Sequence, residues 1–308
     1  SKASAYFCLA EYYQKIDNQK SEEYYVQANK LITDTHVTSI YGNQKFTRDT
    51  IKFFNNSNIE TVSNISKDKG NGLIFIIGMP RSGTTLLESI ISTANDCVAG
   101  GEKLFFSLEC KHIIRDSKTF NIENNLFENL GKKYLDIIEI QRNKNKFYID
   151  KLPDNYFYYK FIRTSLPGAK FLHIHRDPWD NAISIYKQNF QKDLFWASSF
   201  FGIALQYANY EHLMKLWKEE ENDDIFDINY ADLVSDTEEC IKKVWNFCGL
   251  EGEYNESRRQ KHFAQTASKH QVTKKIYSTS LKKLEFEEFK DGFLKDLELQ
   301  RNFWENSK

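Results

Sequence analysis

The chain has 308 residues, of which 41% are hydrophobic and 28% charged, so it can bury a sizeable core and is not disordered, fibrous or low in complexity. Its 42 basic and 43 acidic residues give a formal net charge of -1, which excludes the long-range positive field of a general nucleic-acid binder. Apolar runs such as Leu73 to Met79 are too short to span a bilayer. The five cysteines match no zinc-ligand spacing and are interpreted as reduced. We therefore expect no membrane contact, no metal and no nucleic-acid partner.

Residues 1–35 predict a helical hairpin, with apolar and aromatic side chains at helical spacing on both sides of a polar turn, Asp17-Asn18-Gln19. The pattern is similar to one tetratricopeptide-type (TPR) repeat, which makes it a candidate surface for a protein partner; an ordinary helical hairpin is the alternative. Because a single repeat cannot bury its own apolar face, the hairpin must either continue upstream or pack on the remainder of the chain. Residues 36–71 are polar and predict a connecting helix and linker.

Residues 72–308 predict an α/β domain. Leu73 to Ile77 is a continuous apolar run bounded by glycines, which is typical of a buried parallel strand. Further strand candidates lie at 147–149, 170–175 and 225–228, and they alternate with helical patterns at 84–94, 155–166, 178–190, 196–220 and 231–247. This alternation predicts a P-loop-type parallel sheet flanked by helices. Such sheets bind ligands beyond the carboxyl ends of their strands.

The first strand runs into a glycine-containing loop, residues 78–85, which opens an apolar helix. Loops of this spacing present backbone N–H groups to a phosphate at the helix N-terminus, and a tight turn without ligand is the alternative. Thr84 stands where nucleotide-binding loops have the lysine that reaches the β- and γ-phosphates, which disfavours a kinase or a GTPase. Arg81 supplies a positive charge instead. The anion-binding candidates are Arg81, Ser82, Gly83, Thr84 and Thr85.

The strand, the Pro-Arg-Ser-Gly-Thr-Thr loop and the helix together resemble the sulfotransferase superfamily, whose members use 3'-phosphoadenosine 5'-phosphosulfate (PAPS) as donor. The resemblance is closest to tyrosylprotein sulfotransferases and bacterial sulfotransferases with TPR repeats, and it covers roughly Leu73 to Lys283. It implies that the loop grips the 5'-phosphosulfate. It also implies an enzyme that moves a sulfuryl group to an acceptor hydroxyl and leaves PAP, the desulfonated donor, as product.

The same resemblance assigns the 3'-phosphate of the donor to Arg176, Ser184, Tyr230 and Lys283. Arg176 stands at the end of a strand candidate, and Ser184 lies about two turns into the helix that follows. A planar guanidinium suits a phosphate geometrically. Each residue taken alone is more typical of a turn, a surface or a core.

An acceptor hydroxyl must lose its proton as the new S–O bond forms, which calls for a positioned carboxylate or imidazole. Glu102, in a Gly-Gly-Glu sequence, matches the base of the tyrosylprotein branch. Glu88 and Glu109 are alternatives. Glu88 is expected to face away, because it lies in the helix that the loop opens.

Lys151 matches the family lysine that contacts the transferred sulfuryl group, where negative charge builds on the leaving oxygen. Ser268 matches the serine that holds the sulfuryl oxygens, in a polar stretch expected to close over the site. Glu102, Arg81, Lys151 and Ser268 are therefore the catalytic candidates for a direct in-line transfer. No metal is implied, and His173 and His175 are interpreted as packed residues.

The acceptor stays open among peptide tyrosine, carbohydrate and small-molecule hydroxyls. Its specificity is expected to lie in loops such as 111–145 and 188–201, which carry no recognisable motif. Two other functions remain as alternatives: a P-loop nucleotide kinase, and a catalytically inactive TPR and nucleotide-binding interaction protein. With no signal peptide or membrane anchor in the sequence, we expect a cytoplasmic protein of a bacterium.

Overall fold

The computed structural model describes residues 1–36, 41–56, 65–116, 125–143, 145–190, 194–219, 223–252, 254, 259 and 286–307. The chain divides into two compact units whose segments interleave along the sequence. Unit 1 comprises Ser1–Arg48, Asp177–Lys215 and Thr279–Lys308, and unit 2 comprises Asp49–Arg176 and Leu216–Ser278. The division expected from sequence, at residues 35 and 71, follows chain order instead and stays a prediction.

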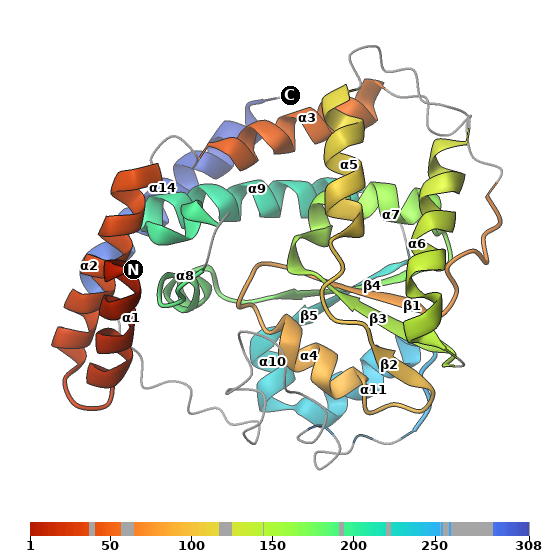
Figure 1. The fold of residues 1–308 in the computed structure, drawn as a ribbon, viewed down its shortest axis with the longest axis horizontal. Helices are drawn as coiled ribbons and strands as arrows, with labels where there is room; N and C mark the ends of the chain where they lie inside the picture. Colours follow the sequence, from red (N-terminus) through yellow and green to blue (C-terminus); the bar gives the residue numbers. More distant parts are fainter. Residues whose placement is uncertain are drawn as a thin grey trace. The chain divides into compact units, whose positions relative to one another are not determined.

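Unit 2 is built around a five-stranded sheet of order β2-β3-β1-β4-β5, in which all neighbours are parallel (Figure 1). The strands are β1 (Leu73–Ile77), β2 (Cys97–Ala99), β3 (Phe147–Lys151), β4 (Lys170–His175) and β5 (Ile225–Asn229). β1 lies in the middle and is buried along its whole length, as its unbroken apolar sequence predicts. The predicted α/β class with a parallel sheet is confirmed, whereas β2 is a strand that the sequence did not predict.

Helices cover both faces of this sheet (Figure 1). On one face lie α4 (Thr84–Ile91), α10 (Tyr230–Ser235) and α11 (Thr237–Cys248), and on the other α5 (Phe105–Asp116), α6 (Leu126–Arg142) and α7 (Tyr159–Ser165), which follows the short helix η3 (Pro153–Tyr158). Because successive side chains of a strand point to opposite faces, β1 serves both cores. Ile74 and Ile76 join an aliphatic cluster with α4 and α11, whereas Phe75 stacks on Phe171 with 5.4 Å between ring centroids.

The segment 111–145, expected to form an acceptor loop, is largely helical in its described part. It contains the end of α5 and all of α6, so the loop prediction is wrong there. The physical reason is a helical repeat of apolar side chains on α6 that pack inward: Phe127, Leu130, Tyr134 and Ile138. Within the second expected loop, 188–201, the short helix η4 spans Phe195–Ser198.

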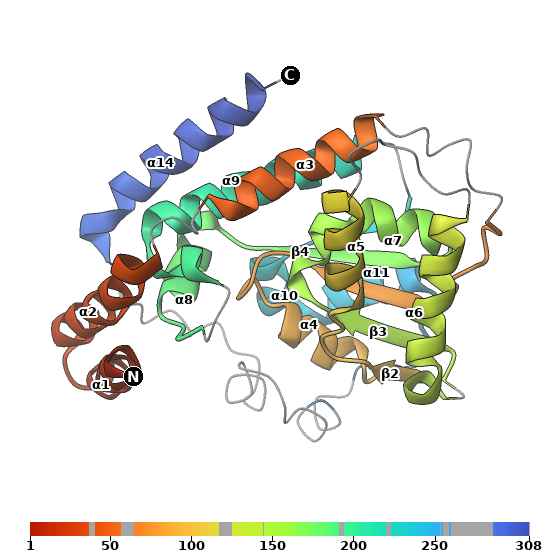
Figure 2. The same ribbon diagram turned by 45° about the horizontal axis from the view of Figure 1, so that its top comes forward.

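Unit 1 begins with two helices joined by a short turn, α1 (Lys2–Tyr13) and α2 (Asn18–His36), which confirms the predicted hairpin (Figure 2). The Ser21 hydroxyl donates a hydrogen bond of 2.7 Å to the Ala10 carbonyl and ties the two helices together. The Asn29 amide donates a bond of 2.9 Å to the carbonyl of Tyr186, at the end of α8 (Pro178–Tyr186). The hairpin therefore packs on the remainder of the chain, as its apolar face requires, and its assignment as a TPR repeat stays a prediction.

Unit 1 has an aromatic core where α8, the start of α9 (Phe200–Lys218) and the start of α14 (Glu287–Glu305) meet. α14 belongs to unit 1, while α3 (Gly42–Asn56) and α9 contribute residues to both units. Phe200 stacks on Tyr186 with 4.3 Å between centroids and lies against Phe286 and Phe293. Over the described ranges, none of the helices is long and apolar enough to cross a bilayer.

Candidate active site

The loop between β1 and α4 has a backbone that two of its glycines make possible. Gly78 has a φ of 151°, and a Cβ there would lie 2.3 Å from the carbonyl oxygen of Ile174 in β4. Gly83 has a φ of 112°, and its Cβ would lie 2.5 Å from the ring of Tyr230. Neither position accepts a side chain, because both the dihedral angle and the space are unavailable to L-residues. The tight phosphate-loop shape predicted from the glycine spacing is thus present.

The loop and the start of α4 carry three buried polar side chains, Ser82, Thr84 and Thr85. The Ser82 hydroxyl is buried and has no hydrogen-bond partner within the described residues. Thr84 and Thr85, in the first turn of α4, are also buried. A buried hydroxyl without a partner is costly unless a ligand or water satisfies it. The loop is therefore arranged to receive a polar group, and the helix N-terminus favours an anion.

Two arginines meet beside this loop because parallel strands end at the same edge of the sheet. Arg81 lies in the loop after β1, and Arg176 directly follows β4, the neighbour of β1. Burial, and then the nearby guanidinium of Arg176, lower the pKa of Arg81 from its ordinary value. Tyr230, which follows β5, places its ring 4.7 Å from the Arg176 guanidinium carbon. Like charges held together in this way favour the binding of an anion between or beside them.

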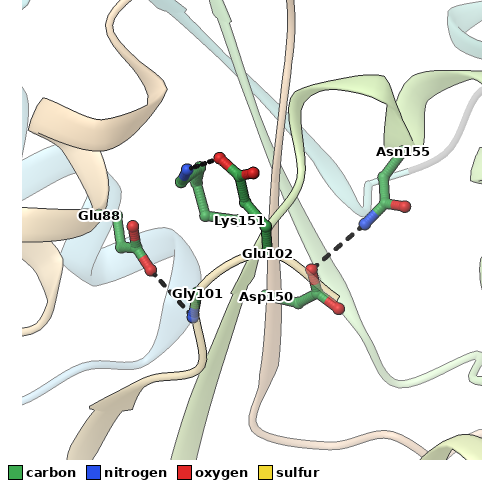
Figure 3. A network of polar contacts seen from close by, with 6 residues as sticks. All are labelled: Glu88, Gly101, Glu102, Asp150, Lys151 and Asn155. Carbon is green, nitrogen blue, oxygen red and sulfur yellow. Dashed lines mark hydrogen bonds and ion pairs between the residues drawn. The ribbon is translucent and has the colours of Figure 1, made fainter. Parts of the chain in front are cut away.

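Lys151 and Glu102 form an ion pair at the end of β3 (Figure 3). The Lys151 side chain is 1% exposed, whereas that of Glu102 is 50% exposed. Lys151 is the register partner of Ile76, so the pair lies next to the strand that leads into the loop. The structure thus brings the predicted base and the predicted lysine into direct contact.

The turn that carries Glu102 is fastened to β3 by the backbone. The Gly100 N–H donates to the Ile149 carbonyl at 2.7 Å, and the Lys151 N–H donates to the Gly101 carbonyl at 3.0 Å. Gly101 has a φ of 69°, a left-handed conformation that glycine adopts readily, and it turns the chain immediately before Glu102. These bonds extend the β2–β3 pairing beyond β2 and fix the position of the backbone that leads into Glu102.

Glu88 does not face away, as expected from sequence; it is buried beside the turn (Figure 3). Its Oε1 accepts a hydrogen bond of 3.2 Å from the Gly101 N–H, while its Oε2 has no partner within the described part of the chain. Burial raises the pKa of Glu88 to about 7, against the opposing effects of Lys151 and the Gly101 N–H. The sequence signal for this role is a single charged residue in a helix whose other residues are apolar or carry small hydroxyl side chains.

Asp150 lies on the opposite face of β3 from Lys151, since neighbouring strand residues alternate. It is buried and accepts hydrogen bonds from the Tyr134 hydroxyl at 2.7 Å and from the Asn155 amide at 3.4 Å. Burial raises the pKa of Asp150 to about 7, and that of Asp154 to about 6. Both buried carboxyls therefore hold their protons to a higher pH than an exposed aspartate does.

One of the two histidines of β4, His173, has a well-defined partner. His173 is buried, and its Nδ1 lies 2.5 Å from Asp227, which also pairs with Lys218 at 2.7 Å. Burial lowers the pKa of His173 to about 4, so the ring packs in its neutral form. His173 is thus a packed residue, as predicted. Among the residues that the structure describes, no group of three His, Cys, Asp or Glu side chains is placed to hold a metal ion.

Several predicted site residues lie elsewhere. Glu109, an alternative base, is on α5 and pairs at 3.4 Å with the exposed Lys133 and not with Lys151. Ser184 lies on α8 in unit 1, so its part in phosphate binding stays a prediction. Ser268 and Lys283 lie outside the described residues.

Comparison with known proteins gives matches of three kinds. The model of a sulfotransferase family matches residues 74–256, more than half of the chain. An uncharacterized protein of Aquifex aeolicus (strain VF5) is 28% identical over 312 residues, and the match covers 92% of this chain but only 39% of that protein. The sulfotransferase domain from the olefin synthase of Synechococcus PCC 7002 is 15% identical, with a TM-score of 0.49 over 75% of this chain and 98% of that chain. Mouse sulfotransferase SULT7A1 complexed with PAP is also 15% identical, with a TM-score of 0.44 over 81% of this chain and 92% of that chain.

Proposed function

This chain belongs to the sulfotransferase family, and we propose that it moves a sulfuryl group from PAPS to an acceptor hydroxyl by direct in-line transfer. The observation that carries the proposal is the Glu102–Lys151 ion pair next to the phosphate-type loop. One member of the pair is a candidate base that is half exposed, and the other is a buried cation. Family membership counts against the nucleotide kinase, and an inactive binding protein remains an outcome of the tests below.

The residues beside the loop fit the two phosphate ends of PAPS. When bound, PAPS supplies an activated sulfuryl group on its 5'-phosphate. The loop residues Arg81, Ser82, Gly83, Thr84 and Thr85 would hold that end, and the buried Ser82 hydroxyl without a described partner supports this assignment. Arg176 and Tyr230, together with Ser184 and Lys283, would hold the 3'-phosphate. The neighbouring positive charges of Arg81 and Arg176 would then be balanced by a ligand of high negative charge.

Glu102 would take the proton of the acceptor hydroxyl. Its half-exposed carboxylate can reach an acceptor from solvent, and it contacts the Lys151 ammonium. Lys151, together with Arg81 and Ser268, would stabilise negative charge on the transferring group. Positioning and electrostatics carry the reaction, as in phosphoryl transfer, and no covalent intermediate is needed.

The closest resemblance in sequence makes peptide tyrosine the first acceptor to try, followed by carbohydrate and small-molecule hydroxyls. The N-terminal hairpin remains a candidate site for a protein partner, and a bacterial cytoplasmic location is part of the same proposal. Because the chain spans 39% of the length of its curated relative, these assignments concern this segment and not the activity of a whole protein.

A panel of hydroxyl acceptors with ³⁵S-labelled PAPS tests the reaction and its base together. We expect Glu102→Gln to lower kcat by about 10²- to 10⁴-fold, the usual contribution of a positioned general base. The matched control is Glu109→Gln, which removes a carboxylate of α5 that pairs with Lys133 away from the cluster. Full turnover by Glu102→Gln would reject Glu102 as the base, and PAP binding without turnover on any acceptor would favour the inactive binding protein.

A further inference from the structure

Glu88 is a charged side chain in the interior of α4, the helix that opens at the phosphate-type loop. Seven of the eight residues of this helix are buried, and Glu88 itself is 1% exposed. Burying a carboxyl far from water is costly without a specific partner. The hydrogen bond that Glu88 accepts comes from another element.

That partner is the turn that carries Glu102. Glu88 Oε1 accepts from the Gly101 N–H at 3.2 Å, one residue before Glu102 (Figure 3). On the β3 side the turn is held by backbone bonds of Gly100 and Gly101. The bond from Glu88 holds it on the α4 side. A displacement of the turn would move the Glu102 carboxylate away from Lys151.

The charges at this point also depend on Glu88. Lys151 is an almost fully buried ammonium, and it interacts electrostatically with both Glu102 and Glu88. When Glu102 takes a proton in the proposed reaction, its contribution to balancing Lys151 is lost. Glu88 then remains as a second carboxyl that can carry the compensating negative charge.

We propose that Glu88 is a positioning residue for the Glu102 base. Glu88 holds the Gly100–Gly101–Glu102 turn against α4 and, together with Glu102, balances the positive charge of the buried Lys151 ammonium. This inference rests on the proposed function for its kinetic part only. Glu88 interacts electrostatically with Lys151 of β3 and with Glu102 of the turn, and it also acts on Tyr148 and Asp150, which lie on the other face of β3.

The direct test of the contact needs no turnover. The chain contains 13 glycines, so selective ¹⁵N-glycine labelling gives a tractable spectrum in which Gly101→Ala identifies the Gly101 amide. As Glu88 ionises near its raised pKa of about 7, the Gly101 amide signal should shift with pH, and it should not do so in Glu88→Gln. A Gly101 amide that does not titrate in the unmodified chain, or that titrates equally in Glu88→Gln, overturns the proposal.

The kinetic test separates positioning from general packing. In Glu88→Gln the amide oxygen still accepts from Gly101 but carries no charge. We therefore expect kcat to stay near that of the unmodified chain below pH 7, where Glu88 is protonated, and its pH profile to lose the inflection near pH 7. Glu88→Met removes the acceptor and should lower kcat by about 10²-fold with PAP affinity kept, as expected for a misplaced catalytic group. The control is Ser89→Ala, because among the described residues that buried hydroxyl donates within α4, to the Leu86 carbonyl at 2.6 Å.

Each outcome of the kinetic test either supports or overturns the positioning role of Glu88. Equal kcat in Glu88→Met and in the unmodified chain, or a loss of PAP affinity as large as the loss of kcat, overturns the positioning role. Should Glu88→Met fail to fold, Glu88→Gln and the amide titration still decide it. If the unmodified chain turns over no PAPS, the proposed function fails, whereas the Gly101 titration still confirms or rejects the contact.

Discussion

Lys151 places a positive charge in the protein interior, and its neighbours must balance that charge. The side chain is 1% exposed and contacts Glu102, whose own side chain is 50% exposed. A buried charge loses its hydration and remains stable only if it is paired. At this residue the needs of folding and of the proposed chemistry coincide, since the same ammonium is placed to stabilise a leaving oxygen.

Replacement of Lys151 by Met should therefore impair catalysis more than donor binding. We expect kcat to fall by about 10²- to 10³-fold, the usual cost of removing one group that stabilises charge in the transition state. PAP affinity should persist, because the proposal assigns the phosphate contacts to the loop and Arg176. Single-turnover kinetics with PAPS and calorimetry with PAP measure the two effects. The control is Lys133→Met, on the exposed pair with Glu109, and an equal loss of kcat in both variants would contradict the assignment.

The buried Asp150 gives a second expectation at the same scale. Its carboxylate accepts from the Tyr134 hydroxyl at 2.7 Å, and Tyr134→Phe removes that donor. We expect a loss of about 1–3 kcal/mol in the free energy of unfolding, the usual cost of a buried group left without its partner. The loss should be larger above pH 7, where Asp150 is ionised, than at pH 5.5, where it is protonated. Urea denaturation at the two pH values measures it, and equal losses would contradict it.

Among the elements, the strand–loop–helix unit β1–loop–α4 depends on backbone angles that few residues adopt. Gly83 precedes α4 with a φ of 112°, and the Gly83 carbonyl accepts the first helical bond, from the Leu87 N–H at 3.0 Å. The N–H groups of the first helical turn remain directed outward, which is the arrangement that binds phosphate.

Gly83→Ala should damage this element in two ways. The positive φ costs an L-residue about 1–3 kcal/mol, and the new Cβ would lie 2.5 Å from the Tyr230 ring. We expect a lower unfolding midpoint and a large loss of PAP affinity, read by thermal unfolding with and without PAP.

The opposite result is expected for Gly292→Ala, which serves as the control. Gly292 lies within α14, and a Cβ there meets nothing within 4 Å. Alanine should stabilise the chain by about 0.4–1 kcal/mol, because it restricts the unfolded state and favours helix. Comparable destabilisation by both substitutions would show that the effect at Gly83 is not specific to the loop.

The elements also differ in how well their sequences predict them. β1 and β4 coincide with the predicted strands, because buried parallel strands are unbroken apolar runs. β2 spans Cys97–Ala99 and is too short to show any periodicity. α6 has a helical repeat that could have been recognised, whereas the helix predicted at 231–247 is two, α10 and α11, separated at Asp236. There Asp236 caps α11 by accepting from the Glu239 N–H at 3.3 Å.

The candidate site also contains residues that a local motif predicts and a residue whose placement depends on tertiary contacts. Arg81, Lys151 and Glu102 are predicted as site residues from motifs, since their spacing along the chain resembles that of the family, and the structure brings Glu102 and Lys151 into contact. Glu88 was misplaced because an acid in a helix usually faces solvent, and only the contact between α4 and the Gly101 turn reverses that. Side-chain burial that depends on a neighbouring element cannot be read from one segment alone.

For the whole molecule, the buried carboxyls predict how stability depends on pH. The pKa of Asp150 rises from 3.8 to about 7 and that of Glu88 from 4.5 to about 7, so both contribute stability that is complete at low pH and is lost as the pH rises towards 7. His173, with its pKa lowered to about 4, acts in the opposite direction as the pH falls below 6.5.

Comparison with Asp150→Asn isolates one of these groups, since the contribution of His173 is common to both proteins. Between about pH 4.5 and 7 the free energy of unfolding should fall more steeply in the unmodified chain, by up to about 1.4 kcal/mol per pH unit. Urea denaturation across this range measures the slopes. Parallel slopes would show that Asp150 is already ionised at low pH in the folded state.

The most direct test of the central claim is calorimetric titration of PAP, ADP and AMP into the unmodified chain, Arg176→Ala and Arg163→Ala. Arg163 is the matched control, because it pairs at 3.0 Å with Asp224, which precedes β5 at the other end of the strands. We expect PAP to bind at least about tenfold more tightly than ADP or AMP, and Arg176→Ala alone to remove that preference, since a charge-assisted bond to phosphate is worth about 1.5–3 kcal/mol. Tighter binding of ADP than of PAP, or a preference for PAP unchanged in Arg176→Ala, would contradict the assigned donor site.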